Sequence, residues 1–108
     1  MTYSIRLVEW NSDVATLLTQ SNLPVDDLGG NTPVVLFGGF TQQQLVGVVG
    51  VQPCGTAALV RSLAVLPAAR GSGLGALLVS HAEQHARHAG MHTAYLLTNS
   101  ATTFFERL

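Results

Sequence analysis

A short glycine-rich segment of this 108-residue chain has the composition of a phosphate-binding loop. Residues 70–76 read Arg-Gly-Ser-Gly-Leu-Gly-Ala, and they stand between a strand-like run and a helix-like run. Glycines at alternate positions let consecutive backbone N–H groups turn toward one point, and the N-terminus of a helix attracts negative charge. A tight turn with a glycine cap would need neither three glycines nor the arginine. The segment therefore predicts a site for a phosphate group.

Two other phosphate motifs fit this segment poorly. Residues 71–76 satisfy the dinucleotide pattern Gly-x-Gly-x-x-Ala, which is a weak signal alone. They follow an expected antiparallel meander, and the run at 92–98 has no Asp or Glu to hold a ribose. A nucleoside-triphosphate P-loop needs Gly-Lys-Ser or Gly-Lys-Thr, and neither follows. A nicotinamide-binding fragment is thus the weaker alternative. The segment better fits the pattern Arg-x-x-Gly-x-Gly, which begins at Arg70 after a run ending in Val-x-Pro.

Arg61 is a second candidate for binding an anion. It lies in the strand-like run before the loop and shares the alternation of Leu59, Leu63 and Val65. A guanidinium in such apolar surroundings suits bidentate bonding to a substrate carboxylate or phosphinate. The alternative is an arginine at a strand edge whose head group reaches solvent. The sequence leaves both interpretations open.

Other chemically active residue types have simpler explanations. His81, His85 and His88 recur at helical spacing, and the first two would be able to share a metal ion. No suitable Asp or Cys completes the site, so we interpret them as part of a solvated helix face and predict no metal site. Tyr95, on an expected central strand, is typical of a core aromatic residue. Cys54 has no base beside it in the sequence and is not an expected nucleophile.

The elements around these residues indicate a mixed α/β fold. The expected strands cover 3–9, 34–40, 45–51, 57–65 and 92–98; the expected helices run from Asn11 or Ser12 to about Asn22, over 73–89 up to a Gly90 cap, and from Asn99 or Ser100 onward. Short connections make the three middle strands an antiparallel meander. The helix at 73–89 then joins 57–65 to 92–98 by a right-handed crossover, as parallel neighbours or as strands splayed at one end.

Composition limits the class of partner. Only 10% of residues are charged and the formal net charge is −1, so the chain has no basic surface for a nucleic acid. A single cysteine suits a reducing compartment, and no apolar run has the ~20 residues of a membrane-spanning helix. We therefore expect one cytoplasmic domain covering residues 1–108, with no nucleic acid or membrane partner. A surface with so few charges also predicts self-association, as a homodimer.

The segment 61–75 resembles motif A of the GNAT superfamily of N-acetyltransferases, and residues 95–108 resemble motif B. The combination of residues 61–65, 96–98 and 104–108 is similar to the arsenic-resistance N-acetyltransferase branch of that superfamily. The resemblance implies an acyl-CoA N-acyltransferase fold, with acetyl-CoA as the acetyl donor and a primary amine as the acceptor. The narrower branch implies a small anionic acceptor, an arsenic- or phosphorus-containing mimic of glutamate.

The resemblance also implies roles for particular residues. The backbone of Leu63, Ala64 and Val65 would pair with the pantetheine arm, and the Val65 N–H would donate to the oxyanion. Backbone amides of the loop would hold the pyrophosphate. The full set of implied cofactor contacts is Leu63, Ala64, Val65, Arg70, Gly71, Ser72, Gly73, Leu74, Gly75, Ala76, Asn99 and Phe105.

The sequence departs from the family pattern near its end. Phe105 stands where members commonly place a tyrosine, on the last helix, as the acid for the departing thiolate. Thr98 stands where an asparagine is expected, and Asn99 follows one position late. The chain stops at Leu108, where the family adds further strands, so the strand at 92–98 is expected to keep an open edge that pairs with another chain. These departures also permit a non-catalytic acyl-CoA-binding or assembly module, and no side chain is assigned as acid or base.

Overall fold

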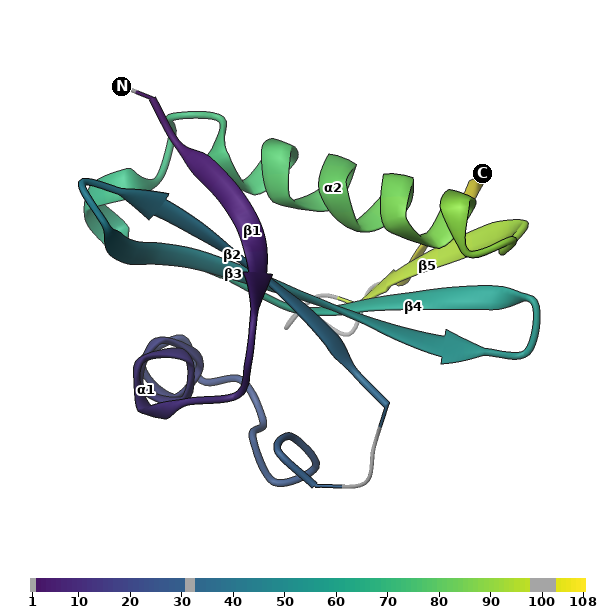
Figure 1. The fold of residues 1–108 in the computed structure, drawn as a ribbon, viewed down its shortest axis with the longest axis horizontal. Helices are drawn as coiled ribbons and strands as arrows, with labels where there is room; N and C mark the ends of the chain where they lie inside the picture. Colours follow the sequence, from purple (N-terminus) through teal and green to yellow (C-terminus); the bar gives the residue numbers. More distant parts are fainter. Residues whose placement is uncertain (1, 31–32, 98–102) are drawn as a thin grey trace.

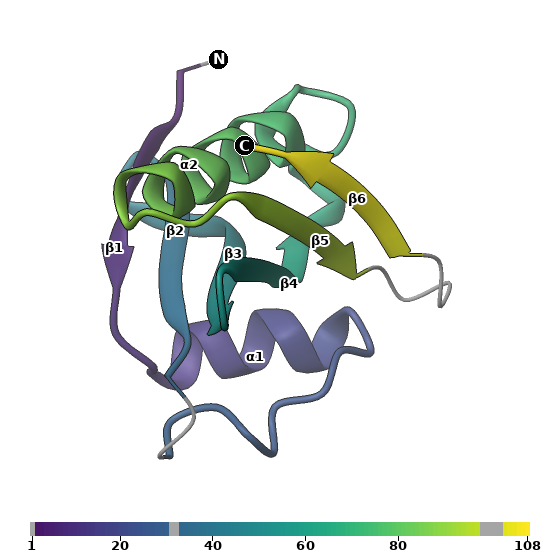
Figure 2. The same cartoon turned by 90° about the vertical axis from the view of Figure 1, so that its right-hand side faces the viewer.

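One mixed sheet with a helix on each face forms the molecule (Figures 1 and 2). The computed structural model describes residues 2–30, 33–97 and 103–108. In order, the elements are β1 (Ser4–Val8), α1 (Ser12–Gln20), β2 (Val35–Thr41), β3 (Gln44–Cys54), β4 (Ala57–Val65), a 3-10 turn (Pro67–Ala69), α2 (Leu74–His88), β5 (Thr93–Leu97) and β6 (Thr103–Arg107). The strands lie in sequence order, and every neighbouring pair is antiparallel except β4 with β5. The predicted mixed α/β fold is confirmed.

Helix α1 begins and ends close to the predicted positions. Asn11 is its N-cap, and the side-chain oxygen accepts from the Val14 backbone N–H at 3.0 Å. The buried residues of α1 recur at the spacing of one helix face, and they are Val14, Leu17 and Leu18. They pack against the face of the sheet opposite α2, as Figure 2 shows. After α1 the chain crosses back to β2 through residues 21–34, whose described part contains no helix or strand.

Helix α2 covers the other face of the sheet. The helical spacing in the sequence predicts one apolar stripe on this helix, made of Leu74, Leu77, Leu78, Ala82, Ala86 and Ala89, and the observed stripe is narrower. Its buried residues are Leu74, Leu78, Ala82 and Ala86. Leu77, predicted to join them, is 46% exposed because it lies about 60° outside the stripe at ~100° per residue. Ala89, also predicted to join, is exposed because the helix has ended. Gly90 closes α2 as predicted: its N–H donates to Arg87 O, and the Met91 N–H donates to Ala86 O.

The predicted final helix is wrong. Residues 103–107 form β6, which runs antiparallel to β5 and pairs Thr93 with Arg107 and Leu97 with Thr103. The threonine and phenylalanines that begin this segment favour strands, and β5 offers a row of unpaired backbone groups to such a segment. The edge of Thr93–Leu97 that was expected to be open is therefore paired with β6, so the predicted pairing of that edge with another chain is wrong. The expected helix caps, Asn99 and Ser100, lie outside the described residues.

The surroundings of β5 also differ from expectation. Tyr95, predicted to lie in the core, is 40% exposed, because strand alternation directs it away from the side on which Ala94 is buried.

Among the described residues, no helix is both long and apolar enough to cross a membrane.

Candidate functional site

A β-bulge interrupts β4 just before the glycine-rich segment. Arg61 pairs with Gly50 and Ala64 with Val48, so two residues of β4 lie opposite one residue of β3. One of these two, Ser62, is buried and has a left-handed backbone with φ +58°. A bulge bends its strand and increases the local twist. An extended pantetheine arm would need a bulge or a splay beside Val65, and the observed bulge lies earlier in β4, at Ser62.

Beyond the bulge, β4 separates from β5. Their parallel pairing covers only Ala57 to Val60 on β4 and Thr93 to Leu96 on β5. Within residues 33–97, no strand pairs with the β5-facing edge of β4 after Val60. Backbone groups along 61–65 are therefore available on that side to an extended ligand, which would bind like an added strand. The predicted splay of the two strands is confirmed.

The glycine-rich segment leads from this splayed edge into the N-terminus of α2. Gly73 is the N-cap with φ +87°, Gly71 has φ +77°, and no side chain caps the helix. The first-turn amides of α2 have no partner within the helix and point out of its N-terminus. A Cβ built on Gly71, Gly73 or Gly75 would meet no atom within 4 Å. The surface above these amides is therefore open, and the helix dipole favours an anion there.

Side chains of the loop itself and one from the start of the chain hold this loop. Arg70 Nε donates to the Val65 carbonyl at 3.1 Å, which ties the loop to the end of β4. Ser72 Oγ donates to the Ala69 carbonyl and accepts from the Tyr3 hydroxyl at 2.9 Å. Tyr3 is a residue that sequence reasoning missed, because no local pattern relates two residues 69 positions apart. Three side-chain hydrogen bonds thus hold the loop.

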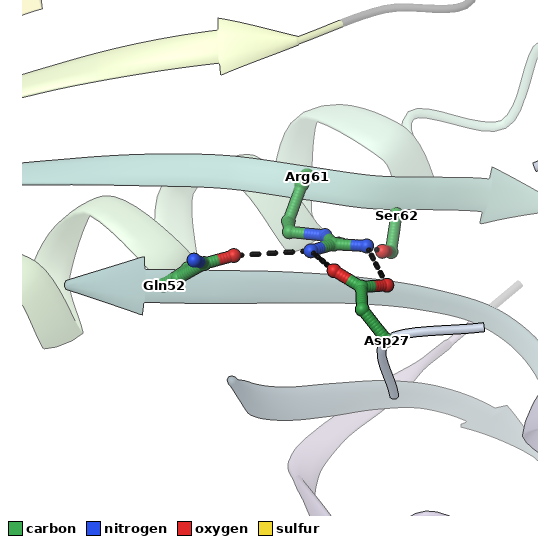
Figure 3. A network of polar contacts seen from close by, with 4 residues as sticks. All are labelled: Asp27, Gln52, Arg61 and Ser62. Atoms are coloured by element: carbon green, nitrogen blue, oxygen red, sulfur yellow. Dashed lines mark hydrogen bonds and ion pairs between the residues drawn. The ribbon is translucent and has the colours of Figure 1, made fainter. Parts of the chain in front are cut away.

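Arg61 has an internal carboxylate partner (Figure 3). Its Nη2 donates to Asp27 Oδ1 at 2.8 Å, its Nη1 binds Asp27 Oδ2, and the same Nη1 donates to Gln52 Oε1 at 3.0 Å. Arg61 Nε donates to Ser62 Oγ at 3.2 Å. The hydrogen bond from Arg61, together with its positive charge, lowers the pKa of the Asp27 carboxyl below its usual value. The side chain of Arg61 is only 11% exposed, so the interpretation in which its head reaches solvent is wrong.

The histidines of α2 are not on a fully solvated face. His81 and His85 are half-buried, and their rings contact Phe37 edge-on with centroid separations of 6.1 and 5.5 Å. Both lie within about 20° of Leu74 around the helix, which explains their partial burial. In the part of the chain that the structure describes, no three His, Cys, Asp or Glu side chains are grouped as ligands for a metal ion. Cys54 is exposed.

Two open clefts lie away from the loop. One, of about 450 Å³, runs between α1 and the β2–β3 turn and reaches Leu66; the other, of about 320 Å³, lies beside Trp10 and Gly29. None of the predicted cofactor contacts lines either cleft. The candidate site is therefore the splayed strand edge and the helix N-terminus.

Comparison with known proteins places the chain in a family. The model of the acetyltransferase (GNAT) family matches residues 3–108. The chain belongs to this family. No curated protein sequence matches the chain significantly.

Solved structures share the fold of this GNAT chain at low sequence identity. An IAA acetyltransferase from Bacillus cereus is 16% identical with a TM-score of 0.77; the match covers 88% of this chain and 65% of that one. N-acetylglutamate synthase from Neisseria gonorrhoeae, complexed with coenzyme A and N-acetyl-glutamate, is 20% identical with a TM-score of 0.77, over 91% and 26% of the two chains. The PaiA N-acetyltransferase from Thermoplasma acidophilum, in complex with coenzyme A, is 16% identical with a TM-score of 0.69, over 94% and 83%. This GNAT chain thus spans less than two thirds of the first two neighbours.

The predicted cofactor contacts of this GNAT chain fall into three groups. The largest group is brought together at the end of β4 and the start of α2, and comprises residues 63–65 and 70–76. Phe105 lies in β6 opposite Tyr95, so its comparison with a tyrosine on a last helix does not hold. Asn99 lies outside the described residues.

Proposed function

We propose that this GNAT chain binds acetyl-CoA along the splayed edge of β4 and transfers its acetyl group to the primary amine of a small acceptor. One observation carries the proposal: within the described residues, the β5-facing edge of β4 has no strand partner at 61–65, and the chain leads within ten residues into the N-terminus of α2 at Leu74, which no side chain caps. The pantetheine arm contains amides that suit a strand edge, and the pyrophosphate suits the first-turn amides of α2. Gly71 and Gly73 supply the positive φ that this turn needs.

The reaction needs positioning more than it needs a particular side chain. The acceptor nitrogen attacks the thioester carbonyl carbon, the C–N bond forms as the C–S bond breaks, and coenzyme A leaves as a thiolate. The Val65 backbone N–H is our candidate donor to the oxyanion, because Val65 lies on the splayed edge. Water takes the proton lost by the amine. Holding the two substrates in reacting geometry supplies a large part of such a rate enhancement.

We propose a carboxylate-bearing, amino-acid-like acceptor, as in the arsenic-resistance branch. Arg61 supports this because its guanidinium already binds a carboxylate in the bidentate manner, that of Asp27. The Neisseria gonorrhoeae neighbour, which is complexed with N-acetyl-glutamate, offers a parallel for an anionic ligand on this fold. An acceptor that used Arg61 would have to displace Asp27.

We further propose a cytoplasmic homodimer. The sparse charge and the exposed Leu7 and Leu77 support the homodimer, and light scattering would test it.

Calorimetric titration with acetyl-CoA tests the cofactor site, and NADP serves as the ligand control. Gly73→Asp places a carboxylate at the N-cap and should abolish binding by repelling the pyrophosphate. Gly73→Asn is the matched variant, because asparagine has the same shape without the charge and tolerates a left-handed backbone. We expect Gly73→Asn to bind acetyl-CoA more tightly than Gly73→Asp, because the two variants differ mainly in the charge. A folded wild-type chain that does not bind acetyl-CoA, or that binds NADP more tightly, would refute the proposal.

Thiol release then distinguishes an enzyme from a binding module. Acetyl-CoA is incubated with a panel of amino acids and simple amines, and free coenzyme A is measured with a thiol reagent. Release that depends on the amine supports transfer. Tight binding without release for any amine would support a non-catalytic acyl-CoA-binding module instead.

A further inference from the structure

The Asp27–Arg61 ion pair joins the long connection between α1 and β2 to the bulge of β4. The two residues are 34 positions apart, and Figure 3 shows the Asp27 carboxylate facing the guanidinium from outside the sheet. The same guanidinium reaches Gln52 on β3 and Ser62 on β4. One side chain thus links the connection and two strands.

Ser62 is held in a conformation that serine rarely adopts. Its φ of +58° lies in the left-handed region, which is strained for a non-glycine residue. Such residues persist when their surroundings fix them. Here the surroundings include burial of Ser62 and the hydrogen bond from Arg61 Nε to its hydroxyl at 3.2 Å.

The orientation of Arg61 in turn depends on Asp27. Arginine has several flexible torsions, and a bidentate carboxylate restricts both the position and the plane of the guanidinium. Gln52 offers only one acceptor, so it cannot fix that plane alone. Neutralising Asp27 removes the counter-ion of the Arg61 guanidinium. The side chain of Arg61 is only 11% exposed, so water would replace that counter-ion poorly. Its contact with Ser62 would then be weakened.

We infer that Asp27 is a positioning residue for the cofactor: through Arg61 it holds the Ser62 bulge, and so sets the splayed edge at 63–65 that faces the pantetheine arm. The inference rests on the proposed function, since it assigns the pantetheine arm to that edge. Asp27 itself touches neither the loop nor the N-terminus of α2 in the described structure. Its effect should therefore be confined to the pantetheine half of the cofactor.

Two ligands separate the halves of the site. Coenzyme A carries both the 3′-phospho-ADP half, which contains the diphosphate, and the pantetheine arm, whereas free 3′-phospho-ADP lacks the pantetheine arm. We expect Asp27→Asn to weaken coenzyme A binding about tenfold, the scale for losing one charge-assisted pair. Binding of 3′-phospho-ADP should stay within about twofold of wild type, since the α2 N-terminus is unchanged.

The neighbouring residue provides the matched control. Asp26 is exposed, and its side chain forms no hydrogen bond or ion pair within the described residues. Asp26→Asn therefore makes the same charge change next to the pair without breaking the pair. Asp27→Glu, which keeps the carboxylate, should recover part of the lost affinity. Arg61→Lys should behave like Asp27→Asn, because lysine lacks the planar fork and the Nε donor.

The outcomes are distinct. Loss of coenzyme A affinity in Asp27→Asn and Arg61→Lys, with 3′-phospho-ADP affinity kept, supports the inference. Equal affinities of Asp27→Asn and Asp26→Asn for coenzyme A overturn it, as does an equal loss for both ligands. A lower KM for an anionic acceptor in Asp27→Asn would support the proposed acceptor site at Arg61, whereas unchanged coenzyme A affinity in the same variant overturns the inference about Asp27. A wild-type chain that binds neither ligand refutes the proposed function itself.

Discussion

Gly75→Ala should make the protein more stable and a poorer binder of acetyl-CoA. Gly75 is the second residue of α2 and, unlike Gly71 and Gly73, its φ is not positive. A Cβ built there meets no protein atom within 4 Å, so alanine causes no clash. The folded protein therefore has no need of a glycine at this position, and a ligand above the first-turn amides is the remaining reason for it.

The magnitude follows from helix propensity. Alanine is better than glycine by about 0.8–1.0 kcal/mol inside a helix. In the first turn of α2 we expect roughly half of this, about 0.5 kcal/mol, because fewer backbone groups are ordered there. For a domain near 100 residues that corresponds to a rise of about 2–4 °C in the melting temperature. A methyl group above the amides should weaken acetyl-CoA binding about fivefold or more, since close backbone approach to a phosphate needs glycine.

The assay pairs thermal unfolding of the free protein, followed by circular dichroism, with calorimetric titration of acetyl-CoA. Gly90→Ala is the control, because Gly90 closes the other end of α2 with φ +85° and also has no atom within 4 Å of a built Cβ. It should lower the melting temperature by strain and leave the affinity unchanged. The reasoning is refuted if Gly75→Ala melts below wild type or binds acetyl-CoA with wild-type affinity.

Two further predictions concern the contacts that hold the site. Tyr3→Phe removes the O–H donor to Ser72 Oγ, so acetyl-CoA affinity should fall about threefold with little change in melting temperature; an unchanged dissociation constant would show that the loop does not need this contact. The Asp27 carboxyl has its pKa lowered from 3.8 by the hydrogen bond from Arg61, so the ion pair stabilises the folded state fully above the unfolded pKa and loses this effect as pH falls through the folded pKa. Urea unfolding should therefore show a constant difference between wild type and Asp27→Asn from pH 5 to 7 that shrinks below about pH 4, and a difference that grows on acidification would contradict the linkage.

Local patterns determined most of the elements. The strand Ala57–Val65 has its predicted bounds, the Asn11 cap opens α1, and Gly90 closes α2, because each depends on side chains only a few positions apart. The sequence likewise predicts a loop at 70–76, from its glycines and from its position between a strand-like run and a helix-like run. The family follows from the same residues.

Long-range contacts decided the rest. Residues 103–107 became a strand instead of a helix because β5 offered backbone partners, which no local periodicity records. The hydrogen bond between Tyr3 and Ser72 joins residues 69 positions apart, and the ion pair between Asp27 and Arg61 joins residues 34 positions apart. Ser62, with its left-handed backbone, lies beside this ion pair. The sequence by itself determined the glycine-rich turn between β4 and α2, which is where we propose that a phosphate binds. Only the tertiary structure decided what holds that site in shape, because those contacts form between segments that only folding brings together.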